Sequence, residues 1–181
     1  MAIRNILNDS DPTLSKISRE ITAFNDRLHI LLDDMQETLI EANGLGLAAP
    51  QVGVLRRVAL IVETIVDDED EEIYEEKIIE LINPQIIYEE GTSNGIEGCL
   101  SVPGAYGFVS RPEKVRVRAQ DRFGKTYEIE CEGMTARAAC HEIDHLNGII
   151  FTTHTDHILT EEELEKLHEE HEEDDNSESE I

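Results

Sequence analysis

The sequence predicts an α+β fold with mostly antiparallel strands around a central metal-binding helix. Apolar residues recur at three- and four-residue steps over 25–42, as on one face of an N-terminal helix. Residues 114–119 alternate strictly between charged and apolar, as in a strand with one face in water. Residues 135–146 form a second amphipathic segment with two histidines, and the C-terminus reads as an acidic helix or tail. The chain of 181 residues shows no internal repeat and is long enough for one domain with a real core.

The first helix is predicted over 25–42. Its end is expected at Asn43-Gly44, because glycine readily takes the left-handed conformation that follows many helices. The small residues of 44–51 then predict a loop. The apolar face of the helix consists of Leu28, Leu31, Leu32, Met35, Leu39 and Ala42.

The strands are predicted from short apolar runs and from alternation. They are expected at 58–62, in two pieces of 78–88 separated at Asn83-Pro84, at 114–119 and at 127–131. Residues 121–125 read as the hairpin turn between the last two strands. The acidic stretch 67–76 is expected to form a solvated loop or hairpin tip.

The central helix is predicted from Thr135, which can cap it, to Leu146, with Asn147-Gly148 as its end. The segment 160–171 is weakly amphipathic and is expected to continue into a disordered acidic tail. These boundaries predict a globular domain over 1–160 and an acidic extension over 161–181.

The net charge of −26 is concentrated in two segments. Residues 67–76 hold 8 acidic residues and no base, and residues 161–181 hold 12 acidic residues and one lysine. The chain lacks the clustered Lys and Arg that a phosphate backbone needs, so we expect no direct nucleic-acid binding. No apolar run approaches the ~20 residues of a membrane span, and the N-terminus shows no signal peptide. We therefore expect a cytoplasmic protein that makes no membrane contact.

The segment His141-Glu142-Ile143-Asp144-His145 is an H-E-x-x-H motif. On a helix the two histidines lie one turn apart on the same face, where both imidazoles can bind one metal ion. The glutamate between them can move protons for a water molecule at that ion. A buried helix face with two unpaired imidazoles would be costly without such a partner. The motif therefore predicts a metal-dependent hydrolase.

A catalytic metal of this kind has three protein ligands and one open position, so a third ligand must come from elsewhere in the chain. Cys99 is the first candidate, because it lies among small residues in Glu97-Gly98-Cys99-Leu100-Ser101. Cys131 and Cys140 are weaker candidates and are expected to be small buried hydrophobic residues. Three cysteines in a reducing compartment also argue against a disulfide framework.

Three segments of the chain together resemble the three conserved motifs of the peptide deformylases. They are Gly44-Leu45-Gly46-Leu47-Ala48-Ala49-Pro50-Gln51, Glu97-Gly98-Cys99-Leu100-Ser101 and His141-Glu142-Ile143-Asp144-His145. The similarity in layout runs from about residue 5 to residue 155. One departure is Cys140, which stands where many family members have glutamine.

The resemblance implies an enzyme that removes the formyl group from the N-terminal formylmethionine of new polypeptides. It implies Cys99, His141 and His145 as ligands of one divalent metal ion, first of all Fe(II), with Zn(II), Ni(II) or Co(II) as alternatives. It implies Glu142 as the general acid and base. The side-chain amide of Gln51 and the backbone N–H of Leu100 would form the oxyanion hole.

The resemblance also implies how N-formylmethionyl peptides bind. Leu45, Gly46 and Gly98 would face the substrate, with both glycines offering backbone hydrogen bonds to an extended peptide. Glu97 is expected to be partly buried and to need a partner, and the resemblance suggests Arg111 for this structural role.

Two other functions remain open on the residues alone. A zincin-type metallopeptidase shares the helical motif but takes its third ligand downstream, where His154 and His157 are the nearby histidines. A binding module with a structural metal would have a closed site of four protein ligands and no use for Glu142.

Overall fold

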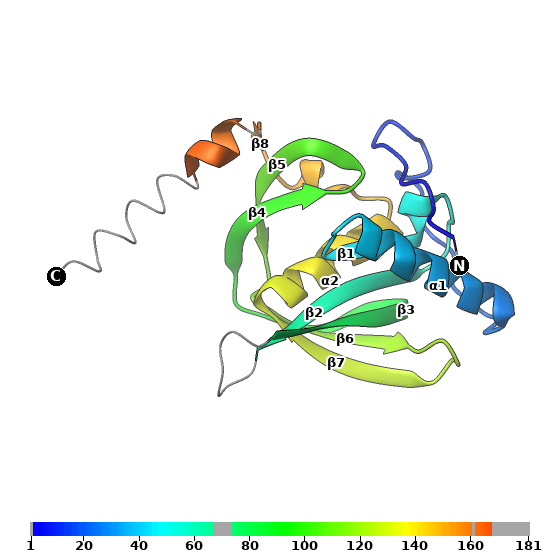
Figure 1. Cartoon of the computed structure of the whole chain (residues 1–181). Coiled ribbons are helices and arrows are strands. Elements are labelled where there is room, and N and C mark those ends of the chain that lie inside the picture. Colours follow the sequence, from blue (N-terminus) through cyan, green and yellow to red (C-terminus); the bar gives the residue numbers. More distant parts are fainter. Residues whose placement is uncertain (1, 67–73, 161, 168–181) are drawn as a thin grey trace.

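The computed structural model describes residues 2–66, 74–160 and 162–167 (Figure 1). Most of the acidic stretch 67–76 and most of the predicted C-terminal tail therefore lie outside the described residues. Residues 162–167 are helical, within the helix predicted over 160–171.

Helix α1 (Asp26–Glu41) matches the first predicted helix. Asn25 caps it, since its side chain accepts hydrogen bonds from the backbone N–H groups of Arg27 and Leu28. The left-handed residue after the helix is Asn43, with φ 49°, so the prediction that Gly44 takes this conformation was wrong. Asparagine tolerates the left-handed region better than most residues, which explains why Asn43 can take this conformation in place of Gly44.

Helix α2 (Gly133–Leu146) is the predicted central helix, but it begins two residues before Thr135. The N-cap is Glu132, which makes no side-chain capping bond, so the predicted cap at Thr135 was wrong. Gly133 has φ 55° and turns the chain from the preceding strand directly into the helix.

A five-stranded antiparallel sheet contains the predicted strands in the order β1-β2-β3-β6-β7. The strand β6 has its apolar side chains buried, as the alternation predicted. The predicted hairpin at 121–125 joins β6 to β7. The bounds are β1 (Gly46–Ala48), β2 (Val58–Val66), β3 (Tyr74–Glu90), β6 (Lys114–Gln120) and β7 (Thr126–Glu132).

Strand β3 runs straight through the break that was predicted at Asn83-Pro84. The irregularity is a register shift between Ile82 and Gln85, where Asn83 has φ 51°. The Asn83 side chain bonds the backbone N–H and C=O of Ile21 at 2.8 and 2.9 Å. A bulge absorbs the proline without ending the strand.

A second, three-stranded sheet joins β4 (Ser93–Cys99), β5 (Val102–Arg111) and β8 (Ile158–Leu159). Its strands were not predicted, because glycines interrupt the alternation of β4 and β5 and because β8 is only two residues long. The predicted loop 44–51 was also partly wrong, since it forms β1 and a 3₁₀ turn, η1 (Ala49–Val52). A further 3₁₀ turn, η2 (Phe151–Thr153), follows α2.

The two faces of the five-stranded sheet carry different helices (Figure 1). Val58 and Leu60 of β2 pack in the cluster that includes α1, whereas Ala59 and Ile61 pack in the cluster that includes α2. Because side chains alternate along a strand, β2 is buried on both faces. Helix α2 thus lies between the large sheet and β4, which confirms the α+β prediction. Within the described ranges, no helix is long and apolar enough to cross a membrane.

Candidate functional site

Helix α2 and the end of β4 bring three metal-binding side chains together. The Cys99 Sγ atom lies 3.2 Å from Nε2 of His145. One ligand atom from each of Cys99, His141 and His145 lies within 4.8 Å of the others. The four-residue spacing of the histidines places both on the face of α2 that points toward β4. Sulfur and two imidazole nitrogens are donors suited to Fe(II), Zn(II), Ni(II) or Co(II).

The Cys99 sulfur also receives hydrogen bonds from its surroundings. The backbone N–H of Ser101 donates to it at 3.4 Å, and Nε2 of Gln51 at 3.6 Å. The two weaker ligand candidates, Cys131 of β7 and Cys140 of α2, lie in the apolar core between the sheet and α2. Burial raises the pKa of each of these thiols to about 11, as expected for small hydrophobic residues.

Glu97 fixes the orientation of the His141 ring. Its carboxylate lies 3.0 Å from Nδ1 of His141, which leaves Nε2 as the free nitrogen. The expected partner Arg111 is present and binds both Glu97 oxygens, at 2.9 and 3.0 Å. Burial alone would raise the pKa of Glu97, but the bonds with His141 and Arg111 hold it at about 2. Glu97 therefore stays ionised beside Nδ1 of His141.

The two histidines differ in their electrostatic surroundings. Burial lowers the pKa of His145 to about 3, so its ring is neutral and keeps a lone pair for a metal ion. Burial would also lower the pKa of His141, but its bonds with Cys99 and Glu97 raise it to about 10. Surroundings that stabilise a proton on His141, next to the Cys99 thiol and the Glu97 carboxylate, also stabilise a metal cation. The donor set and its charges thus fit a divalent ion.

Glu142 lies inside the site with only 4% of its surface exposed. Burial raises its pKa to about 7, and its Oε2 has no hydrogen-bond partner in the described part of the chain. Gly46 makes room for it, since a Cβ atom there would lie 2.4 Å from Oε1. A carboxyl group with this proton affinity can both take and give a proton near neutral pH.

Gln51 is held so that its amide N–H group faces the site. Its Oε1 accepts the backbone N–H of Ala48 at 2.8 Å, which leaves Nε2 pointing at Cys99 and at Oγ of Ser101. The hydroxyl of Ser101 was not singled out in the sequence, although the residue closes the Cys99 motif. Leu100 lies in the turn between β4 and β5 and lines the adjoining cavity.

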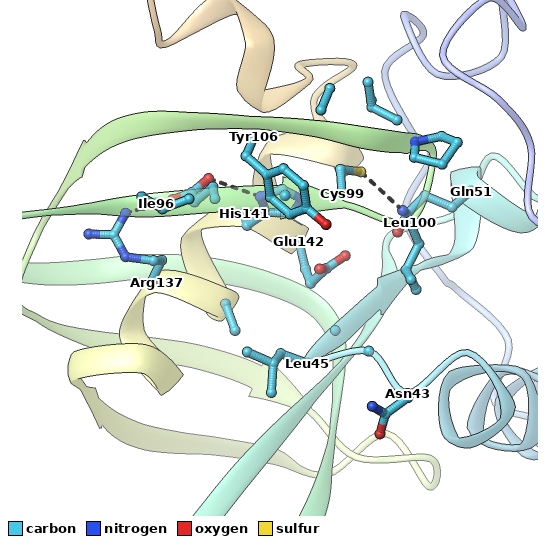
Figure 2. Close-up of a pocket in the computed structure, with 18 of the residues that line it drawn as sticks. Asn43, Leu45, Gln51, Ile96, Cys99, Leu100, Tyr106, Arg137, His141 and Glu142 are labelled. Atoms are coloured by element: carbon cyan, nitrogen blue, oxygen red, sulfur yellow. Dashed lines mark hydrogen bonds and ion pairs between the residues drawn. The ribbon is translucent and has the colours of Figure 1, made fainter. Parts of the chain in front are cut away.

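A cavity of about 520 Å³ opens beside these groups (Figure 2). Leu45, Gly46 and Gly98, the residues that the resemblance places against the peptide, all line this cavity. Several other lining residues were not predicted, because nothing in their sequence context marks them. Tyr106, Met134 and Arg137 are among them.

The downstream histidines lie away from the ligand group. Nε2 of His154 bonds the Asp144 carboxylate at 2.9 Å, and the nearest acidic partner of His157 is Glu163 at 3.6 Å. Among the described residues, the clustered metal-binding groups are Cys99, His141 and His145 alone. This geometry disfavours the arrangement expected of a zincin-type peptidase.

Comparisons with known proteins agree with the geometry. A family model described as Polypeptide deformylase matches residues 3–161. The peptide deformylase of Caldicellulosiruptor bescii is 49% identical over 166 residues, which cover 92% of this chain and 93% of the relative.

Solved structures give the same result. A peptide deformylase from Legionella pneumophila superposes with a TM-score of 0.75 at 39% identity and covers 99% of each chain. The class I type b peptide deformylase from Acinetobacter baumannii, with Met-Ala-Ser bound, has a TM-score of 0.76 at 32% identity. The match covers 84% of this chain and 98% of that one.

Proposed function

Because the chain belongs to the peptide deformylase family, which removes the N-terminal formyl group from nascent polypeptides, we propose that Cys99, His141 and His145 hold one catalytic metal ion. The convergence of these three donors on one point, beside the buried Glu142, carries the proposal. Fe(II) is the metal we propose first, and Zn(II), Ni(II) or Co(II) suit the same donors. When bound, the ion supplies Lewis acidity and lowers the pKa of water toward neutrality.

Glu142 is the proton-transfer group in this proposal. It lies next to His141 in a water-poor position, where its pKa of about 7 allows it to accept the proton of the attacking water. The same carboxylic acid then delivers the proton to the departing amine. Formate and a free N-terminal methionine are the products.

Gln51 and Leu100 stabilise the negative charge that develops on the formyl oxygen when water attacks the formyl carbon. The Gln51 amide is already oriented with its N–H groups toward the site, because its oxygen accepts the backbone N–H of Ala48. A preorganised donor of this kind lowers the activation free energy by about 3 kcal/mol when water is excluded from the site. The backbone N–H of Leu100 is the second donor that we propose, since the residue directly follows Cys99.

The peptide binds as an added strand between β1 and β4. Leu45 and Gly46 from the β1 segment and Gly98 from β4 line the same cavity, so backbone groups of two separate segments are available to the substrate. The relative from A. baumannii binds Met-Ala-Ser, a peptide of the kind that deformylation releases. An enzyme that meets nascent chains in this way works in the cytoplasm, and we assign it no nucleic-acid partner.

The test is formate release from N-formyl-Met-Ala-Ser by anaerobically purified protein, with metal analysis of the same sample. We expect one divalent ion per chain, formate release, and no cleavage of an internal peptide bond. Cys99→Ser should lose both metal and activity, whereas Cys131→Ser should keep the metal. Internal cleavage without formate release would refute the proposal, and full metal retention in Cys99→Ser would refute the ligand assignment.

A further inference from the structure

The three proposed ligands come from two elements that are not joined by a backbone ladder. Cys99 ends β4, whereas His141 and His145 belong to α2. The distance between strand and helix therefore sets the distance between the sulfur and the imidazoles. A residue that ties α2 to β4 would control the geometry of the metal site.

Arg137 makes this connection (Figure 2). It lies one turn before His141, so Arg137, His141 and His145 follow one another along the same face of α2. Its Nη2 donates to the backbone carbonyl of Ser93 at 2.9 Å, and its Nη1 to that of Val109 at 2.9 Å. One guanidinium thus spans β4 and β5 from the helix.

Arg137 also binds the carboxylate that orients the first histidine. Its Nη1 lies 2.9 Å from Oε1 of Glu97, whose other oxygen contacts Nδ1 of His141 at 3.0 Å. Arg111 holds the same carboxylate from another direction. Only 7% of the Arg137 side chain and 3% of the Glu97 side chain are exposed, so water screens the pair little.

The backbone beside Arg137 is shaped around its guanidinium. A Cβ atom at Gly95 would lie 2.9 Å from Nη2 and 3.0 Å from Cζ of Arg137. Gly95 does not have a positive φ, so its backbone conformation does not require a glycine. The close approach of the Arg137 guanidinium explains why no side chain fits there. Arginine suits the place because its planar fork reaches several acceptors at once, which a lysine ammonium cannot do.

We propose that Arg137 is a positioning residue that sets the spacing of β4 and α2, and through Glu97 the orientation of His141, for the metal site. This inference rests on the ligand set proposed above. It goes beyond that set because Arg137 contacts neither the ion nor the reacting atoms. Its loss should weaken metal binding and distort the ligand geometry, in addition to any loss of stability.

The experiment uses the full chain loaded with Co(II), whose visible spectrum reports coordination geometry and whose thiolate charge-transfer band reports Cys99. Wild type, Arg137→Met, Arg137→Lys and Gly95→Ala are compared for that spectrum, for Co(II) dissociation constant, and for thermal unfolding. Arg118→Met is the matched control, because Arg118 also pairs with a glutamate but lies exposed on the five-stranded sheet. Substituting a residue that orients a metal ligand typically costs about 10–100-fold in metal affinity.

We expect Arg137→Met to bind Co(II) about 10–100-fold more weakly, with a shifted spectrum, and Arg137→Lys to bind with intermediate affinity. Gly95→Ala should shift the spectrum in the same direction, and Arg118→Met should match wild type. If Arg137→Met does not fold, the Co(II) spectra and affinities of Arg137→Lys and Gly95→Ala decide whether Arg137 has this role. Wild-type spectra and affinities in the folded variants, even with lowered unfolding temperatures, would overturn the role of Arg137. A wild-type protein without a thiolate band that depends on Cys99 would instead overturn the ligand set itself.

Discussion

The Glu97 carboxylate lies 3.0 Å from Nδ1 of His141 and so assigns the two ring nitrogens to different tasks. Nδ1 is used by the protein, and Nε2 remains for a ligand. Two arginines hold Glu97 in turn, which makes it the centre of a buried charged network rather than a single ion pair. This network therefore fixes the orientation of the His141 ring before any ligand binds to Nε2.

Replacement of Glu142 by glutamine should separate metal binding from turnover. The side chain keeps its size but can no longer carry a proton, so kcat/KM for N-formyl-Met-Ala-Ser should fall by about 10²–10⁴-fold. Metal content should be unchanged, since Cys99, His141 and His145 are intact. Glu128→Gln, on the exposed face of β7, is the control and should match wild type. Formate release near the wild-type rate in Glu142→Gln would exclude the proposed role.

Gly46→Ala should inactivate the enzyme through Glu142. The added Cβ would lie 2.4 Å from Oε1 and 2.7 Å from Cγ of Glu142, so this carboxylate must move. Gly44→Ala is the matched control, because the closest atoms to its Cβ would be the ends of the Leu100 and Leu39 side chains, which can turn aside, and the backbone oxygen of Gly46 would be at an ordinary contact distance of 3.5 Å. Steady-state kinetics should show that kcat falls by at least a ten times larger factor in Gly46→Ala than in Gly44→Ala. This ratio corresponds to a difference of about 1.4 kcal/mol or more in activation free energy. Equal effects would mean that the space at Gly46 has no special relation to Glu142.

Gln51→Glu should reduce kcat while leaving the local fold in place. The new carboxylate can still accept the N–H of Ala48, but it offers no donor to an oxyanion. Loss of one such donor costs about 10²–10³-fold in kcat. Gln85→Glu adds the same charge at an exposed position of β3 and serves as the control. An unchanged kcat in Gln51→Glu would remove the amide from the oxyanion hole.

Stability should fall in acid because of Glu97. Its pKa is depressed from 4.5 to about 2, so its contribution is fully present above pH 4.5 and is lost as the pH falls toward 2. The shift corresponds to roughly 3 kcal/mol. Urea unfolding of wild type and Glu97→Gln between pH 6 and pH 3 measures it. The variant should be less stable at pH 6 and should lose less stability on acidification, and parallel pH profiles would contradict the assignment.

The sequence was sufficient where one residue pattern had one structural meaning. The alternation at 114–119 and the helical spacing at 25–42 led directly to β6 and α1. Strands β4 and β5 were missed because their glycines and short polar residues conceal the alternation, although Cys99 within them was identified. The bulge at Asn83 was read as a break, since a proline there is compatible with either.

The sequence could name candidate site residues but not the network of contacts that surrounds them. The spacing of His141 and His145 is a local property of a helix, so the sequence contains it. The contacts of Arg137 and Ser101 depend on how α2 packs on β4, which no local pattern records. Arg137 was hidden for a further reason, because an arginine on an amphipathic helix ordinarily faces water.

The split of the proposed metal ligands between a strand and a helix has a consequence for the order of folding and metal binding. Cys99 and His145 are 46 residues apart, and Gln51 is a further 48 residues from Cys99. Such distant segments meet only after the costly loop closures of folding have been completed. A chain still emerging, or one whose α2 has not yet docked on β4, has no site to load. With this ligand set, metal binding would be coupled to a late step of folding, and the ion would stabilise the state in which α2 is docked on β4.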